Sequence, residues 1–221
     1  MKFIYSIFFL AFLSTATVVK VCYAQDGVKK LSQQTDEHSS AEEQFNLGVA
    51  YDYGNGVTED DREAVKWYRL AAEQGYAVAQ YNLGLMLYKG RGVTQDEGEA
   101  VKWFRLAAEQ GYADAQFNLG IMFANGSGVT QDVREAVKWY RLAAEQGHAV
   151  AQFNLGIMFA NGEGVIEDDV LAYMWINIAS SNDAEPAAEA RSVLKKRMTR
   201  EQIAEAQRRA RACVEKNYKG C

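Results

Sequence analysis

Histidine and cysteine, the side chains that most often bind metal ions or take part directly in catalysis, are scarce in this sequence. Its 221 residues include two histidines and three cysteines, and these form no cluster with the spacing of a metal site. No motif brings serine, histidine and aspartate together as a hydrolase would need. The sequence therefore predicts no catalytic residue, no metal site and no cofactor site.

Long apolar runs are missing as well, except for one at the N-terminus. Lys2 precedes the apolar run Phe3–Leu13, and small residues lead up to Ala24. This order is typical of a secretory signal peptide, residues 1–24. The run is too short for a comfortable membrane span, and Lys20 stands where a longer one would continue. We expect a periplasmic protein whose mature chain is not stably inserted in a membrane; secretion and an uncleaved anchor are the alternatives.

Basic residues are in the minority over most of the chain. Residues 25–183 hold 12 Lys and Arg against 24 Asp and Glu, a net charge of −12, whereas residues 184–221 hold 10 against 5, a net charge of +5. Phosphate binding needs positive charge over the larger surface, so this balance argues against nucleic acid as the main partner.

Two cysteines, Cys213 and Cys221, remain once a signal peptide ending at Ala24 is removed. In an oxidising compartment a pair near the chain end can close a loop over Val214–Gly220. We predict this disulfide; a free, buried Cys213 on a helix is the alternative.

Repetition is what the sequence has in abundance. Tryptophan recurs every 36 residues, the block EAVKWYRLAAEQG recurs almost unchanged around it, and NLG after Phe or Tyr keeps the same spacing. A fixed period of this length marks stacked units that bury their apolar faces only against neighbours. We expect the repeated rings to lie in the core: Trp67, Trp103, Trp139, Trp175, Tyr68, Phe104 and Tyr140.

Each unit has the pattern of a helix, a glycine loop and a second helix. In the second unit the apolar spacing predicts a first helix over Ala79–Tyr88, and Gly84 within it implies close approach by a neighbouring helix. The G-x-G-V loops suit a helix end and a tight reversal, but they lack the lysine and the strand of a phosphate-binding loop. Asp-x-x-Glu then caps each second helix, and Arg69 is placed to pair with Glu73 on the outer face. The capping pairs are Asp60–Glu63, Asp96–Glu99 and Asp132–Glu135.

The combined pattern, A-x-x-x-L-G-x-x-[YFL]-x-x-G-x-G-V followed by A-V-K-W-[YF]-R-x-A-A-E-Q-G, resembles the Sel1-like repeat, a relative of the tetratricopeptide repeat. The resemblance covers residues 41–183 after a flexible leader at 25–40. It implies an all-α fold, a right-handed α/α superhelical solenoid, and an adaptor or scaffold role in bacterial envelope or signalling processes. We expect a monomer that binds a protein or peptide. The four units are 41–76, 77–112, 113–148 and 149–183.

The fourth unit departs from the pattern on its second helix. Lys138 and Arg141 of the third unit become Met174 and Asn177, which predicts that a face exposed in earlier units is covered here. The cover is residues 184–221, read as one helix over about Glu185–Met198 and another capped by Thr199 and Gln202. A solenoid needs such an atypical end unit, so we predict a C-terminal helical cap.

An asparagine recurs at one position of the predicted first helices, which line the concave surface in related solenoids. An amide there can hydrogen-bond the backbone of an extended peptide; alternatively, each asparagine ties its helix to a neighbouring unit. Two nearby positions vary between units: Asp52 and Tyr53 occupy them in the first unit, and Tyr88 and Lys89 in the second. The candidate peptide-binding residues are Asn46, Asn82, Asn118, Asn154, Tyr53, Tyr88 and Lys89.

The sequence thus favours a non-catalytic interaction scaffold of the bacterial cell envelope. One alternative is an envelope enzyme of the β-lactamase or penicillin-binding type, as in cysteine-rich relatives, but the array at 41–183 has no cysteine and no Ser-x-x-Lys motif. A second alternative is a secreted effector directed at a host. His148 stands where Tyr76 and Tyr112 stand in earlier units, which favours a ring in a turn over a catalytic base.

Overall fold

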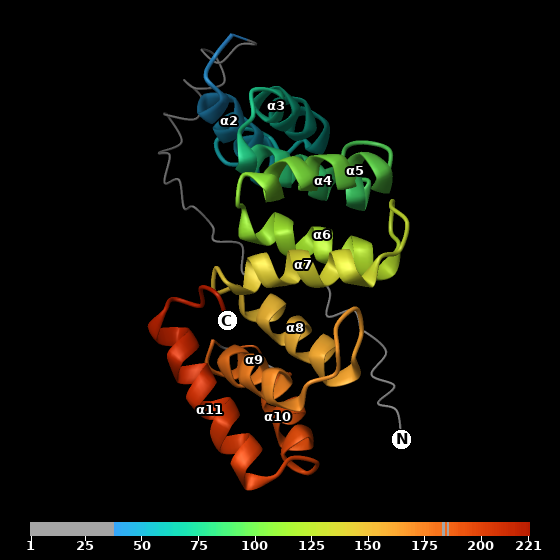
Figure 1. The fold of residues 1–221 in the computed structure, drawn as a ribbon. Helices are drawn as coiled ribbons and strands as arrows, with labels where there is room; N and C mark the ends of the chain where they lie inside the picture. Colours follow the sequence, from blue (N-terminus) through green and yellow to red (C-terminus); the bar gives the residue numbers. More distant parts are fainter. Residues whose placement is uncertain (1–37, 183, 185) are drawn as a thin grey trace.

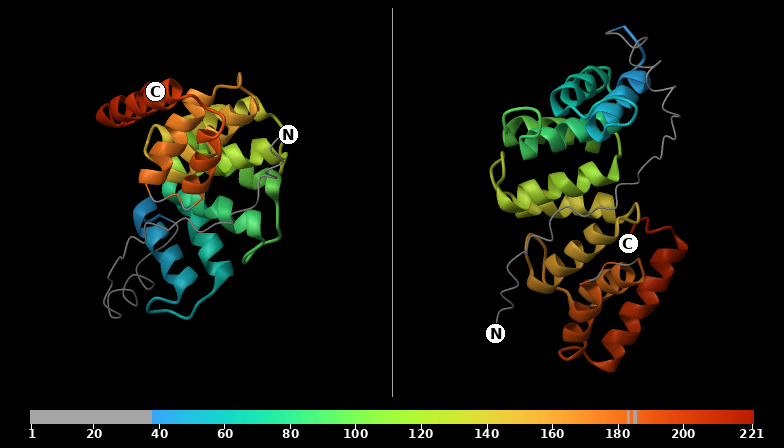
Figure 2. Two further views of the ribbon diagram at one scale, coloured as in Figure 1. Left: turned by 90° about the horizontal axis from the view of Figure 1, so that it is seen from below. Right: turned by 180° about the vertical axis from the view of Figure 1, so that it is seen from behind.

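The computed structural model describes residues 38–182, 184 and 186–221. Within these residues lie ten α-helices and no strands, arranged as consecutive pairs that stack from one end of the molecule to the other (Figure 1). Successive pairs are rotated relative to one another, which gives the stack its superhelical shape (Figure 2). The prediction of an all-α solenoid with a C-terminal cap is confirmed. The helices are α2 (Ala41–Tyr53), α3 (Asp61–Glu73), α4 (Ala77–Lys89), α5 (Glu97–Glu109), α6 (Ala113–Asn125), α7 (Val133–Ala144), α8 (Ala149–Asn161), α9 (Asp169–Ser181), α10 (Ala187–Lys195) and α11 (Arg200–Glu215).

The first helix of each repeat (α2, α4, α6 and α8) ends at a glycine with positive φ, and the second (α3, α5, α7 and α9) begins at a capping aspartate. On α3, for example, the Asp60 carboxylate accepts hydrogen bonds from the backbone N–H groups of Arg62 and Glu63. Thr199 and Gln202 form the predicted capping box at α11. Helix α4 begins at Ala77, two residues before the predicted start at Ala79. The first turn of a helix needs no buried side chain, so the apolar stripe does not mark where the helix begins.

The glycine inside each first helix lies where the second helix of the same repeat comes closest. A Cβ atom on Gly84 would stand 2.7 Å from the Phe104 ring, and one on Gly120 would stand 2.6 Å from the Tyr140 ring. Both rings are buried. The ring of the second helix therefore occupies the space that any larger residue would need, as Gly84 predicted.

The tryptophans are less uniform than expected. Trp67 and Trp175 are buried, whereas Trp103 and Trp139 are half-buried and pack against the core, so the core prediction holds only in part for those two. The Trp103 indole N–H donates to the partly exposed Glu99 carboxylate at 3.2 Å. This contact holds one edge of the ring at the solvated side of α5.

A series of buried glutamines, not predicted from the sequence, fastens each repeat to the one before. Gln116 on α6 is 4% exposed; its Nε2 donates to the Ala108 carbonyl of the preceding repeat at 3.0 Å, and its Oε1 accepts from Gln146 Nε2 at 2.7 Å. Gln80 and Gln152 donate to the equivalent alanine carbonyls and accept from an equivalent amide. We call this series the glutamine ladder: Gln44, Gln80, Gln116 and Gln152.

Replacing Gln116 with leucine should lower the free energy of unfolding by about 1–3 kcal/mol, because the Ala108 carbonyl then stays buried without its partner. Urea denaturation followed by circular dichroism measures the loss. Gln95→Leu is the control: Gln95 is exposed in a loop, and its replacement should change stability by no more than about 0.5 kcal/mol. Equal losses in the two variants would contradict a structural role for the ladder.

The fourth repeat is covered by the cap, as Met174 and Asn177 predicted. Helices α10 and α11 both pack on α9, where Met174 and Ile178 are each 2% exposed. The Arg191 guanidinium on α10 donates to the Asn177 side-chain oxygen at 3.1 Å. The first cap helix is shorter than predicted, Ala187–Lys195, because the residues that follow turn toward α11.

The last residues of the chain close over the end of the glutamine ladder. The structure contains a Cys213–Cys221 disulfide, and within its loop Tyr218 adopts a φ of 65°. Asn182, which donates to Gln152 at 2.9 Å, also donates to the Tyr218 hydroxyl at 3.3 Å. The disulfide loop thus holds a ring where a further repeat would otherwise cover the ladder.

The predicted signal peptide at 1–24 and residues 25–37 of the predicted leader lie outside the described residues. Among the residues that are described, none of the helices has the length and apolar character needed to cross a bilayer.

Candidate peptide-binding surface

The asparagines lie on the side of each first helix that faces away from the second helix of the same repeat. Three residues after each asparagine comes an aliphatic residue, and four residues after that comes a variable residue. This spacing places the three side chains in one stripe along the helix. The aliphatic residues are all half-buried. We call this surface the first-helix stripe: Asn46, Val49 and Tyr53; Asn82, Leu85 and Lys89; Asn118, Ile121 and Asn125; Asn154, Ile157 and Asn161.

The four asparagines do not share one environment. Asn46, Asn82 and Asn154 are half-buried, whereas Asn118 is 5% exposed and its Nδ2 has no hydrogen-bond partner. Burial raises the pKa of Tyr140, and a hydrogen bond from Asn154 opposes that shift. Asn154 therefore ties its helix to the preceding repeat, which is the structural alternative considered for the series.

The missing partner of Asn118 has a simple cause. Phe104 stands where Tyr140 stands, one repeat earlier, and a phenyl ring has no hydroxyl to accept the amide N–H. Phe104→Tyr should therefore raise the free energy of unfolding by about 1 kcal/mol, since it provides the partner that Asn154 already has. Thermal unfolding measures the gain. In an Asn118→Ala background the same substitution should bring none, and an equal gain there would contradict the explanation.

The variable position next to Tyr53 is also structural. Asp52 on α2 accepts a hydrogen bond from the Tyr68 hydroxyl at 3.0 Å. It also forms an ion pair with Arg91 of the next repeat, with 2.8 Å between the charged atoms. Burial first, and the nearby Asp52 carboxylate second, raise the pKa of Tyr68. Asp52 is thus held by a network between the first two repeats and is not available to a partner.

The remaining candidates gather on α2 and α4. Tyr53 is 62% exposed at the end of α2, Lys89 is exposed at the end of α4, and Tyr88 beside it is half-buried. Asn46 and Asn82 lie on the same two helices. The structure therefore separates the predicted residues into an accessible group on the first two repeats and a buried or tied pair, Asn118 and Asn154, on the last two.

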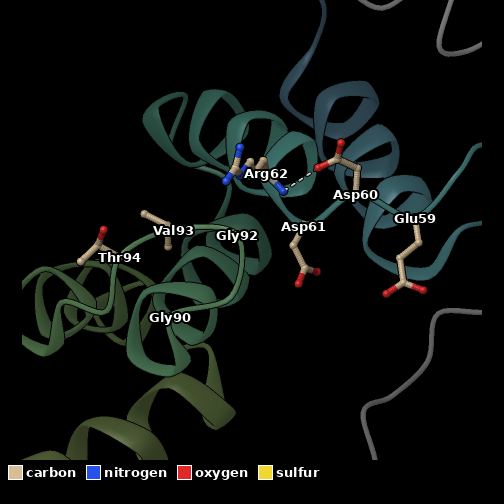
Figure 3. A pocket seen from close by; sticks show the side chains of 8 residues that line it. All are labelled: Glu59, Asp60, Asp61, Arg62, Gly90, Gly92, Val93 and Thr94. Carbon is tan, nitrogen blue, oxygen red and sulfur yellow. Dashed lines mark hydrogen bonds between the residues drawn. The ribbon is translucent and has the colours of Figure 1, made fainter.

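The glycine loops form a second surface at one edge of the stack. A pocket of about 1040 Å³ opens between the loop of the second repeat and the start of α3, lined by Glu59, Asp60, Asp61 and Arg62 (Figure 3). Gly92 packs against α3 so closely that a Cβ atom would lie 2.2 Å from the Asp61 carbonyl oxygen. The second glycine of G-x-G-V is therefore a packing residue.

The described residues were expected to hold no metal site, and His148 was expected to be a ring in a turn. In the part of the chain that the structure covers, no three Cys, His, Asp or Glu side chains lie together as a metal site would require. His148 accepts the Ala151 N–H at its Nδ1 and places Nε2 3.3 Å from Asp114, so it caps α8. The spacing Ser-x-x-Lys does occur in the cap, at Ser192 and Lys195, but both side chains are exposed on α10.

Comparisons with known proteins agree with this architecture. The similar solved structures include a protective antigen present in uropathogenic Escherichia coli strains and displaying an SLR fold, 35% identical with a TM-score of 0.76. They also include a Sel1 repeat protein from Oxalobacter formigenes, 34% identical with a TM-score of 0.68. The first match covers 88% of this chain and 42% of the antigen, and the second covers 74% and 68%. This chain thus spans less than half of the antigen's length. A comparison with curated proteins finds no match.

The family comparison addresses the repeats directly. The Sel1 repeat model matches four consecutive segments, 44–76, 77–112, 113–148 and 149–183. Each segment holds one first helix and one second helix, α2 to α9 in all, except that the match begins three residues inside α2. The protein belongs to the Sel1 repeat family.

Proposed function

We propose that this protein is an exported, non-catalytic scaffold that binds an extended segment of a protein partner on its first two repeats. A Sel1 repeat solenoid is a protein-interaction type of fold. The disulfide supports an oxidising compartment outside the cytoplasm, and the periplasm is the location that we propose.

One observation carries the proposed site. On α2 and α4 the first-helix stripe exposes part of Val49 and Leu85 next to the amides of Asn46 and Asn82. Aliphatic side chains can bury the apolar residues of a partner while the amides hydrogen-bond its backbone. Because the helices are already ordered, binding costs little conformational entropy on this side of the interface.

A crosslinking pull-down with the mature chain from envelope extract tests the site. The double variant Asn46→Ala/Asn82→Ala should reduce capture of the specific partner about tenfold, since it removes two hydrogen-bonding groups from the centre of the surface. Asn154→Ala is the matched control: it should lower stability through loss of the Tyr140 contact and leave capture intact.

Unchanged capture by the double variant would remove these residues from the site. A further measurement addresses catalysis: the purified mature chain should not hydrolyse nitrocefin. Turnover that a point mutation abolishes would contradict the non-catalytic proposal.

A further inference from the structure

The outer side of α7 has an open pocket of about 530 Å³ with an apolar floor and a cationic rim. Its lining comes from α7 and from Gly164 in the loop of the fourth repeat. Val137 and Leu142 supply the aliphatic surface, and Leu142 is 44% exposed. We call this surface the α7 pocket: Arg134, Val137, Lys138, Arg141, Leu142 and Gly164.

The same face of the next repeat is already covered by helices. Met174 and Ile178 on α9 are the equivalents of Lys138 and Leu142, one repeat later, and each is 2% exposed under the cap. On α7, by contrast, the Lys138 side chain is 67% exposed. On α9 this face is thus covered by helices, whereas on α7 the same face keeps its charged residues and is open.

The charges around the α7 pocket determine what kind of partner surface can bind there. Three basic side chains, Arg134, Lys138 and Arg141, surround the apolar floor, and Glu135 is the one carboxylate paired with them, through Lys138. The Arg141 guanidinium lies over the Phe159 ring, 5.6 Å from its centroid, which keeps it beside the pocket. The corresponding positions of α3 are also basic, Arg62, Lys66 and Arg69, but there Arg69 pairs with Glu99 of the next repeat at 2.7 Å. The pocket beside the start of α3 is lined by three carboxylates as well as Arg62 (Figure 3). Leu171 stands beside Arg141 where Glu99 stands beside Arg69, so the next repeat provides no carboxylate at that place and the cations of the α7 pocket are less neutralised.

We propose that the α7 pocket docks an acidic amphipathic helix of a partner protein, whose leucine-sized side chains enter between Val137 and Leu142 while its carboxylates pair with the three cations. The volume is in the range of pockets that hold a ligand group of this size. Helix docking on an apolar groove with flanking charge is a common mode of peptide recognition. This site is independent of the first-helix stripe, which lies on other helices.

A labelled synthetic peptide tests the proposal without knowledge of the natural partner. The probe is a helical 16-residue peptide with leucines on one face and glutamates on the flanks; the comparison peptide has lysine in place of every glutamate. Fluorescence anisotropy should give a Kd of about 10–100 μM for the acidic peptide at low salt, weakening at least about tenfold in high salt. The lysine peptide should bind at least about tenfold more weakly.

Two variants locate the site with a matched control. Leu142→Glu should weaken acidic-peptide binding at least about tenfold. Leu106→Glu places the same charge on α5 at a leucine of equal exposure, 44%, and should leave binding within about twofold. The double variant Asn46→Ala/Asn82→Ala should also bind the peptide normally, which separates this inference from the proposed function. Absence of binding near 1 mM, equal binding of the lysine peptide, or equal losses in the two leucine variants would overturn the proposal.

Discussion

Gly128→Ala should destabilise the protein by about 3 kcal/mol or more, a large effect for the addition of one methyl group. Gly128 is the second glycine of the third G-x-G-V loop and has a φ of 67°. A Cβ atom there would stand 2.3 Å from the Glu97 carbonyl oxygen at the start of α5. Because that obstacle is backbone, the loop must move away from the preceding repeat. Urea denaturation followed by circular dichroism measures the loss.

Gly111→Ala separates the two causes of this loss. Gly111 also has a positive φ, 89°, but no atom would lie within 4 Å of a Cβ there. Its replacement should cost only the left-handed backbone strain, about 1–2 kcal/mol. A loss for Gly111→Ala as large as that for Gly128→Ala would show that contact between the repeats contributes nothing.

Trp175→Ala should cost about 3–5 kcal/mol, the usual range for deleting a large ring from a closed core. Trp175 is fully buried because the cap covers α9, whereas Trp103 is half-buried on α5. Trp103→Ala should therefore cost less, about 1–3 kcal/mol, since part of its ring is already in water. Chemical denaturation of both variants measures the difference.

The position of Trp175 also predicts where unfolding begins. The stability of a repeat array depends on contacts between neighbouring repeats, so in the Trp175→Ala variant the fourth repeat and the cap should unfold first. Hydrogen exchange should show α9 to α11 opening before α4 to α6 in the variant. Equal opening throughout, or equal losses for the two tryptophans, would contradict this account.

The sequence was sufficient to predict features that depend on one repeat alone. The helix pairs, the aspartate caps and the close-packed glycines all follow from spacing within 36 residues. It could not predict partners chosen across a repeat boundary. Arg69 was expected to pair with Glu73 on its own helix, but it pairs with Glu99 of the next repeat at 2.7 Å. Arg69 pairs with the carboxylate of the next repeat because Glu99 also accepts a hydrogen bond from the Trp103 indole N–H, so one carboxylate satisfies two donors.

The candidate site shows the same limit more sharply. Asn118 and Asn154 are equivalent in the sequence but differ in the structure, because the ring at the relevant position belongs to the preceding repeat. Tyr140 provides a hydroxyl for Asn154, and Phe104 provides none for Asn118. A periodic sequence therefore predicts where a side chain lies on its helix, but the irregular neighbours determine whether a partner protein can reach it.

The glutamine ladder bears on how such a protein can change its length. Gln80, Gln116 and Gln152 each reach 8 residues back to an alanine carbonyl and 30 residues forward to an amide. Deletion of the whole unit 77–112 would place Gln116 opposite the Ala72 carbonyl, a group identical to the one it lost. Recombination between repeats in the gene would thus leave every ladder bond matched, provided that it adds or removes 36 residues at a time. Shorter gains and losses inside a repeat would break the register, so the ladder favours evolution of the array by whole units.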